Sequence, residues 1–344
     1  MNENKYLTNA THAVLLILGV LALMIVGQKL FIPLTWAFLF SFVLHPFCRF
    51  LEKHRFGRTT ASLTAVLVFC FVSGFILIYL IYEAVRILEN EPVLYSKMKE
   101  QITALLAKFQ EATGVALYDP QAESNSSSEP LMKALPWVAK QVSSIGENLV
   151  TVLLVPIYLF FMLTFRGTIK RFVRHRFEQE HLDFLSLLLK NSRNAVQSYL
   201  NGTLVLTALV ALVTFIILLS LGIRHAFFFS VFYAILSLIP YIGHLIAFII
   251  IIVFAWVTKD SGLSVILVAV ALYVVNVSQE NFLRPKLIGN KMEMNSMVVF
   301  SAVVVGGMIW GLSGMVLFIP LLGVLKAITV SHGSLKSYTT LFEP

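Results

Sequence analysis

The chain has 344 residues, of which 58% are hydrophobic and 13% charged, and its formal net charge is +8 at pH 7. A soluble domain carries roughly 25% charged residues, so water could not cover this much apolar surface, and the composition indicates a membrane protein. The basic residues cluster in short loops beside apolar segments, which argues against nucleic acid as a partner. Cys48 and Cys70 both lie in apolar runs, so neither a disulfide framework nor a cysteine-based zinc site is expected.

Three apolar segments lie in the N-terminal part of the chain, residues 1–83. No small-residue cleavage site follows the first, residues 7–27, and a second apolar run at 30–51 begins almost at once. A retained membrane helix is therefore expected rather than a secretory signal peptide. The third segment, 61–82, has 22 residues, enough at about 1.5 Å per residue to cross a hydrocarbon core of roughly 30 Å.

Residues 84–148 break this pattern. Apolar residues recur at helical spacing among charged ones at 94–109, and a Ser/Asn-rich turn at 124–128 precedes a second helical stretch near 131–145. Such amphipathic spacing is typical of helices that pack on one side and face water on the other. The segment is therefore predicted to be an extramembrane helical insert.

Residues 149–200 combine a fourth membrane helix, 149–165, with a basic segment. Within 166–177, apolar residues stand among cations in a pattern that predicts a piece lying along the inner membrane face, with a plain solvated helix as the alternative. This segment and the loop at 49–58 are the most basic short loops. The positive-inside rule therefore places both of them and the N-terminus in the cytoplasm, and the insert outside.

Residues 201–330 form two successive units, each an unbroken apolar helix followed by a broken apolar segment. The unbroken helices are 204–221 and 263–277, and the broken segments are 227–258, interrupted at 239–243, and 297–325, interrupted at 306–307 and 311–314. Each arm of the first broken segment would be about 20 Å long, too short to cross but long enough to reach the midplane and return. Turning back also keeps more Lys and Arg inside than single crossings would.

The sequence thus predicts an all-α polytopic membrane protein with about six spans plus two broken helical hairpins, eight hydrophobic segments in all. If both broken segments turn back, the two units have opposite orientations, the inverted repeat common in secondary transporters. Single crossings of the broken segments remain the alternative topology. Residues 331–344 are expected to form a cytoplasmic tail.

The two breaks are the expected substrate site, because a backbone break in lipid persists only where it is buried in protein or faces a water-filled cavity. Pro240 removes a backbone donor and Gly243 permits a positive φ, which would leave free polar groups at the first tip. The alternatives are a simple kink at the first tip and close helix packing at the second. The predicted substrate-binding residues are Pro240, Tyr241, Gly243, Gly311, Ser313, Gly314, Asn276 and Asn281.

A polar cluster ends the second unbroken helix. Glu280 is its one acid, beside Gln279, and an ionisable group near the membrane interior predicts a proton or cation site. A surface pair with Arg284, four residues on, is an equal alternative. His244 is a further candidate for ion coupling, although a hydrogen-bonded structural histidine is favoured. Arg284 and Lys286 would contact an anionic group or, by preference, lipid headgroups.

Three ordered blocks resemble the signature of a known family. They are LSLIPYIG at 236–243, QENFLRPKLIG at 279–289, and a third that begins GLSG at 311 and ends at Pro320. These blocks are similar to those of the autoinducer-2 exporter (AI-2E) family of bacterial membrane proteins, and the likeness covers nearly the whole chain outside the insert. The chain has His244, Thr203 and Asn295-Ser296 where family members commonly have Pro, Gln and a His-Pro-like pair. The resemblance implies either signal export or sodium/proton antiport.

No metalloprotease, phosphate-loop or nucleophile-elbow motif occurs, so neither enzymatic activity nor a cofactor or metal is expected. The expected function is secondary transport of a small polar solute or signal molecule across the bacterial inner membrane by a multi-pass homo-oligomer. An ion gradient would drive it, and the two tips would meet near the midplane. The alternatives are a sodium (lithium)/proton antiporter and a non-transporting membrane scaffold. The expected partners are the small molecule or ion and the lipid bilayer.

Overall fold

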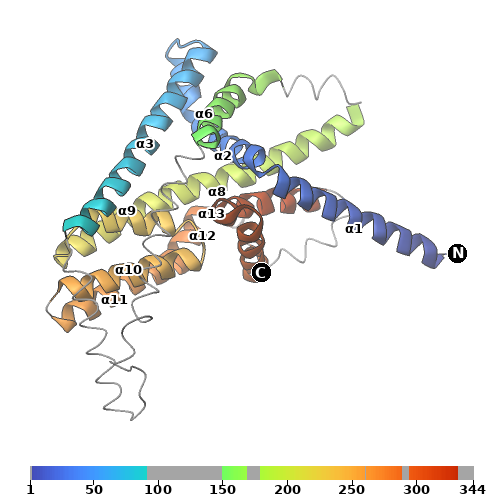
Figure 1. Cartoon of the computed structure of the whole chain (residues 1–344). Helices are drawn as coiled ribbons and strands as arrows, with labels where there is room; N and C mark the ends of the chain where they lie inside the picture. The colour runs from blue at the N-terminus through green and yellow to red at the C-terminus, as the bar shows by residue number, and fades with distance from the viewer. Residues whose placement is uncertain (1, 91–148, 169–178, 260, 289–293, 332–344) are drawn as a thin grey trace.

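The structure is a computed structural model that describes residues 2–90, 149–168, 179–259, 261–288 and 294–331 (Figure 1). Within these ranges the regular elements are all helices, and no strand occurs. Most of the expected extramembrane insert, the core of the basic segment after the fourth membrane helix, and the expected tail lie outside the described residues. The expectations for those three segments stay predictions.

The N-terminal helices are α1 (Asn2–Val26), α2 (Gln28–Lys53), α3 (Arg58–Asn90) and α6 (Leu149–Thr164). Helices α2, α3 and α6 pack against one another around a cluster in which small residues such as Ala37 and Ala65 face the larger Leu159. Small residues let helix backbones approach closely, which drives association where lipid removes the hydrophobic contrast. This three-helix group occupies one side of the molecule (Figure 1).

The C-terminal part is built on the long helix α8 (Gln179–Ser220), which contacts α9, α12 and α13. The elements that follow it are α9 (Ala226–Leu236), α10 (Ile242–Thr258), α11 (Gly262–Ser278), the π-helical turn η2 (Gln279–Leu283), α12 (Arg284–Ile288) and α13 (Ser296–Ser331). Their shared core is almost wholly apolar, as expected where helices pack inside a membrane bundle. Figure 1 shows α9, α10 and α11 side by side below α8.

The first broken segment turns back on itself. Helix α9 ends at Leu236, the chain turns through five residues, and α10 begins at Ile242 and packs against α9. The arms have 11 and 17 residues. Both are shorter than the roughly 20 residues that a membrane crossing needs.

The second broken segment also reverses, although helical residues run through it. Trp310 (φ −127°, ψ 16°) and Gly311 (φ 59°, ψ −142°) leave helical geometry inside α13. A Cβ built on Gly306 or on Gly314 would overlap the backbone carbonyl of the other glycine. Residues eight positions apart in a straight helix are on the order of 12 Å apart. Such close approach therefore requires the chain to double back at Trp310 and Gly311.

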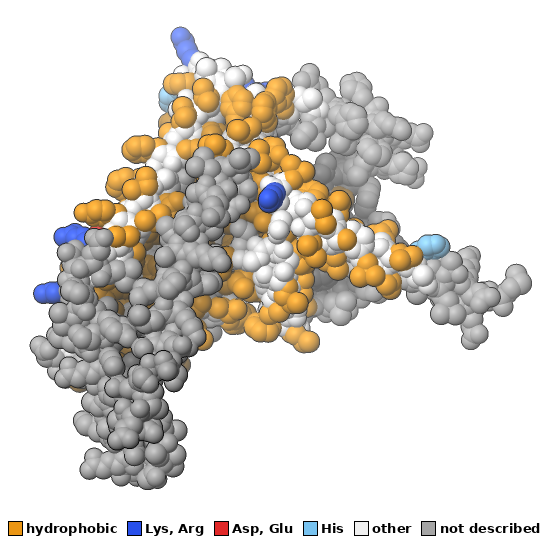
Figure 2. All heavy atoms as spheres, in the orientation of Figure 1, with side chains coloured by type: hydrophobic (Ala, Val, Ile, Leu, Met, Phe, Trp, Pro, Cys, Tyr) orange, Lys and Arg blue, Asp and Glu red, His pale blue; other side chains and the backbone are white. Residues whose placement is uncertain are grey.

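In the part of the chain that the structure describes, five helical stretches are long and apolar enough to cross a membrane. By length and composition they are Gln28–Lys53, Arg58–Ile87, Asn191–Ser220, Gly262–Ile288 and Ser296–Val330, the last of which reverses at Trp310. Hydrophobic side chains cover much of the visible described surface, and scattered basic ones stand at the top, near the middle and at the left edge (Figure 2). The expected all-α polytopic fold is confirmed.

Candidate functional site

The first tip holds its backbone in a strained turn. Tyr241 has φ 64° and ψ −61°, and the amide of Ile242 donates to the carbonyl of Pro240 at 2.7 Å. This is a γ-turn of the rare positive-φ kind, a geometry that persists where the surrounding structure enforces it, commonly at functional sites. The strain falls on the aromatic residue that lies at the apex of the hairpin.

Gly243 has a different role from the one expected. The positive φ at this tip belongs to Tyr241 and not to Gly243. Gly243 is instead required because a Cβ there would overlap the carbonyl oxygen of Leu236, the last residue of α9. The glycine thus lets α10 start directly against the end of α9, and it fixes how tightly the hairpin closes.

A cavity of about 330 Å³ lies against this tip. Four separate parts of the chain supply its walls: α8, the tip, the stretch from η2 to α12, and α13. The described lining residues are Tyr199, Pro240, Tyr241, Glu280, Arg284, Pro285, Ile288, Met294, Ser296, Val299 and Ile319. Its volume is at the lower end of the roughly 300–1,000 Å³ found for small-molecule sites, which suits a small solute.

Glu280 and Arg284 form an ion pair on the cavity wall. Arg284 Nη2 donates to Glu280 Oε1 at 2.9 Å; the Arg284 side chain is 25% exposed and that of Glu280 40%. The pair considered from sequence is therefore present, and both of its members also line the cavity. Pairing and contact with a solute do not exclude each other here, because a carboxylate has two oxygens that accept hydrogen bonds.

Gln279 and Glu280 are the first two residues of the η2 turn. At its end the amide of Arg284 donates to the carbonyl of Gln279, five residues back, which widens the helix locally. Single π-helical turns inside α-helices occur frequently at functional sites. Gln279 is buried against the core, whereas its neighbour Glu280 is exposed at the cavity.

Buried polar groups without protein partners lie behind the cavity. Gln279 is 1% exposed, and neither its amide oxygen nor its amide nitrogen has a hydrogen-bond partner among the described residues. Nε2 of His244 likewise makes no hydrogen bond of good geometry, although its ring lies close enough to the Gln279 amide for the two side chains to interact. The same ring meets that of Tyr233 edge-on at 5.6 Å. Each such group costs about 1–3 kcal/mol unless water or a solute satisfies it.

The two tips contact different parts of the molecule. The Tyr241 ring lies 6.0 Å from that of Phe300, in the first arm of α13, whereas Trp310 Nε1 donates to the carbonyl of Met24 in α1 at 3.0 Å. Trp310 also packs in a cluster with Leu39 of α2. The two tips thus have different neighbours, and the expected meeting of the tips near the midplane stays a prediction.

The predicted site residues divide accordingly. Pro240, Tyr241, Glu280 and Arg284 line the cavity, and Gln279 and His244 are buried behind it. The described lining of the cavity does not include the second-tip residues Gly311, Ser313 and Gly314. Nor does it include the exposed Asn281 and Lys286, or Asn276, which is half-buried on α11.

Sequence reasoning missed several residues of this site. Tyr199 lines the cavity from α8, about eighty positions before Glu280, and Ser296 lines it from the start of α13. The Tyr233 ring packs on His244. Tyr199 does lie in the stretch Tyr199-Leu200-Asn201-Gly202, but nothing in its local pattern shows that it faces Glu280.

Long apolar helices, two chain reversals and a small, mainly apolar cavity with an ion pair in its wall are typical of polytopic membrane transport proteins. The chain belongs to the AI-2E family of transporters, whose family model matches residues 13–331. It is 26% identical over 350 residues to a Haemophilus influenzae protein named "Putative transport protein", with 96% of each chain covered. It is 23% identical over 315 residues to "Putative transport protein YueF" of Bacillus subtilis, covering 87% of this chain and 83% of that one.

Proposed function

We propose that this membrane transporter is a secondary transporter, which moves a small polar solute or signal molecule across the bacterial inner membrane and is driven by an ion gradient. The observation that carries the proposal is the unsatisfied, buried Gln279 and His244 directly behind a cavity walled by Glu280 and Arg284. Donors and acceptors that lack protein partners favour binding of a polar solute, because hydrogen bonds to the solute would offset the cost of their desolvation.

The Glu280–Arg284 pair is the proposed coupling element. While Glu280 is ionised, it holds Arg284 at 2.9 Å. A proton on Glu280, or a solute group that replaces it at Arg284, removes the attraction and changes the charge of the cavity wall. Because the wall is shared by the first hairpin, α12 and α13, such a change would alter how these parts pack against each other.

The orientation follows from charge and extends the proposal. The cations Arg49, Lys53, Arg58 and Arg166 all lie at one end of the α2–α3–α6 group. From the positive-inside rule we propose that this end lies in the cytoplasm. Helical hydrogen bonds continue from α1 into α2 through Gly27, so the N-terminus extends away from this end (Figure 1), and its cytoplasmic location stays a prediction. We further propose that the protein works as a homo-oligomer in the lipid bilayer.

The test is transport by purified protein in proteoliposomes, with proton and sodium gradients imposed separately and candidate polar solutes inside. Gradient-dependent movement of a solute supports the proposal. Dissipation of a sodium or lithium gradient by protons without any solute would favour the antiporter, for which the carboxylate of Glu280 near the His244 ring is the supporting observation. If the protein produces neither solute movement nor ion exchange, that result would contradict transport by this site.

Solvent access separates a transporter from a scaffold. In a chain with Cys48 and Cys70 changed to Ser, Ser296→Cys at the cavity should react with a membrane-impermeant maleimide in native membranes. Leu245→Cys is a matched control, because this apolar residue of α10 is 60% exposed and would face lipid. Equal protection of both cysteines would favour the scaffold.

A further inference from the structure

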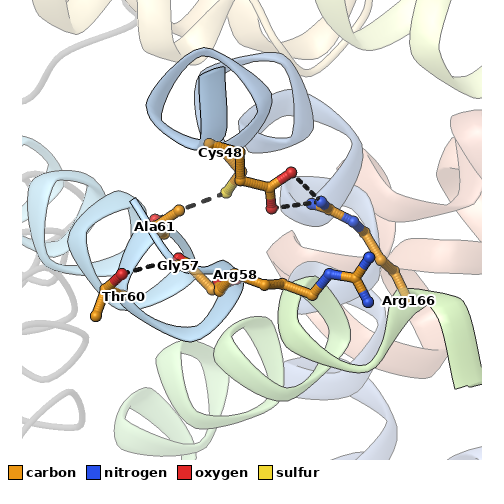
Figure 3. A network of polar contacts seen from close by, with 8 residues as sticks. Cys48, Gly57, Arg58, Thr60, Ala61 and Arg166 are labelled. Carbon is orange, nitrogen blue, oxygen red and sulfur yellow. Dashed lines mark hydrogen bonds and ion pairs between the residues drawn. The ribbon is translucent and has the colours of Figure 1, made fainter. Parts of the chain in front are cut away.

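A second group of charged side chains lies where α2 and α6 end and α3 begins, away from the cavity at the first tip. Arg58 is the first residue of α3 and Arg166 follows α6 by two positions. The Arg58 side chain extends toward Arg166 between the helices (Figure 3), and a Cβ on Gly167 would lie 3.5 Å from Arg58 Nη1. Close packing of α2 on α3, where Cys48 Sγ lies 3.9 Å from the Ala61 carbonyl, holds these ends together.

The guanidinium groups of Arg58 and Arg166 offer more hydrogen-bond donors than the single carboxylate of Glu52 can accept. Arg166 Nη2 donates to both carboxylate oxygens of Glu52, at 2.5 and 2.7 Å. Its other terminal nitrogen, Nη1, is buried and has no hydrogen-bond partner among the described residues. The described part of the chain also places no carboxylate within ion-pair distance of Arg58. Glu52 is thus neutralised by one arginine, and the remaining guanidinium donors lack an anion.

Further positive potential surrounds the same place. Arg49, Arg166 and Arg193, from three segments of the chain, are all close enough to His45 to act on it electrostatically, as is the one carboxylate Glu52. The α3 helix begins here with no acidic residue in its first turn. The amino end of a helix carries a partial positive charge, so an acid or a bound anion would normally stand there.

The shape of the surface indicates what kind of anion fits. A cavity of about 660 Å³ adjoins the cluster, and its described lining is Pro46, Arg49, Phe50, Glu52 and Lys53. Phe50 and Phe165, on α2 and just after α6, are 56% and 52% exposed. A ligand with a negatively charged head and apolar chains would contact both the cations and these rings. Basic pockets between membrane helices at the cytoplasmic side are suited to anionic headgroups.

We propose that the ends of α2, α3 and α6 form a binding site for the phosphate of an anionic phospholipid. The exposed Arg58 would donate to the phosphate oxygens, as guanidinium groups do in charge-assisted pairs, and Arg166 behind it would add positive charge. Arg49 and Lys53 would add charge at the mouth, and the acyl chains would lie along Phe50 and Phe165. Free phosphate offers the same oxygens without the chains, so the experiment must separate the two.

The test uses the full-length protein, purified in detergent and delipidated. Native mass spectrometry would count retained lipids while phosphatidylglycerol, phosphatidylethanolamine or inorganic phosphate is added, and thermal unfolding would be followed in parallel. We expect phosphatidylglycerol to bind at least tenfold more tightly than phosphatidylethanolamine and to raise the unfolding temperature. Inorganic phosphate at millimolar concentration should neither raise it nor displace the lipid. Full displacement by phosphate would overturn the lipid assignment.

Arg58→Gln is the decisive variant, because it removes a guanidinium and keeps the Glu52–Arg166 pair. We expect it to lose the preference for phosphatidylglycerol while unfolding at an unchanged temperature without lipid. Arg86→Gln is the matched control, since Arg86 lies at the other end of α3, and it should bind like the unmodified chain. If Arg58→Gln does not fold, Arg49→Gln replaces it with the same expectation. Unchanged lipid preference in the folded variant would overturn the proposal.

Discussion

Glu83 Oε1 lies 2.5 Å from His225 Nδ1, although 142 positions separate the two residues in the chain. Glu83 is buried near the far end of α3, and His225 stands in a left-handed conformation (φ 56°) just before α9. Beside them the rings of Tyr79 and Phe227 meet at 5.3 Å. This contact fastens α3 to the turn between α8 and α9, and thus attaches the N-terminal helices to the part that holds the cavity.

Glu83→Ala should therefore lower stability. The change removes the partner of a mostly buried imidazole, and the expected loss is about 1–3 kcal/mol. Thermal unfolding in detergent measures it. Arg86→Gln is the control: Arg86 is 54% exposed and 3.7 Å from Glu83, so its loss should cost less than about 1 kcal/mol. Equal effects of the two variants would show that the Glu83–His225 contact contributes little.

The tip glycines should respond differently to alanine. At Gly243 the new Cβ would overlap the Leu236 carbonyl, so Gly243→Ala must push α10 away from α9 and should abolish transport. At Gly311 no atom lies within 4 Å of the new Cβ, and the cost comes from φ 59° alone, about 1–3 kcal/mol. Transport rates and unfolding temperatures of both variants test this. Gly74→Ala, in open space on α3, is the control.

Glu280→Gln should uncouple transport from the ion gradient. The amide keeps the shape of the carboxylate but neither titrates nor pairs with Arg284 as an ion, so solute should still bind while gradient-driven accumulation is lost. Uptake in proteoliposomes with and without an imposed pH gradient separates these two properties. Normal accumulation by the variant would remove Glu280 from the mechanism and leave His244 as the next residue to test.

Gln279→Met should raise stability and impair transport together. Methionine has a similar length, and it replaces two buried polar atoms that have no protein partner, so unfolding should become harder by up to about 1–3 kcal/mol. If those atoms contact the solute, the same change should lower its affinity. Unfolding temperature and solute binding are measured on one preparation. A variant that binds solute normally would show that Gln279 is only a structural residue.

Part of this picture could be predicted from local sequence. The membrane class follows from composition, and the places of both breaks follow from Pro and Gly, because a missing donor or side chain acts on the backbone within a turn of its own position. Turning back was favoured over crossing from the lengths of the arms and the positions of Lys and Arg. The Glu280–Arg284 pair was foreseeable for the same reason, since residues four apart share a face of a helix. These are short-range effects that a stretch of sequence contains in full.

The tertiary structure alone decided which residues share a site. Whether Tyr199 or Ser296 faces Glu280 depends on how each helix is rotated and where the helices cross, and these follow from packing along their whole length. Helix packing also decides what surrounds each tip, since α1 and α2 lie beside Trp310 of the second tip. The need for glycine at position 243 is likewise a tertiary effect, because it arises from the nearby carbonyl of Leu236 and not from the φ of Gly243 itself. Hydropathy determines which segments enter the membrane, whereas contacts between distant segments determine what each residue meets there.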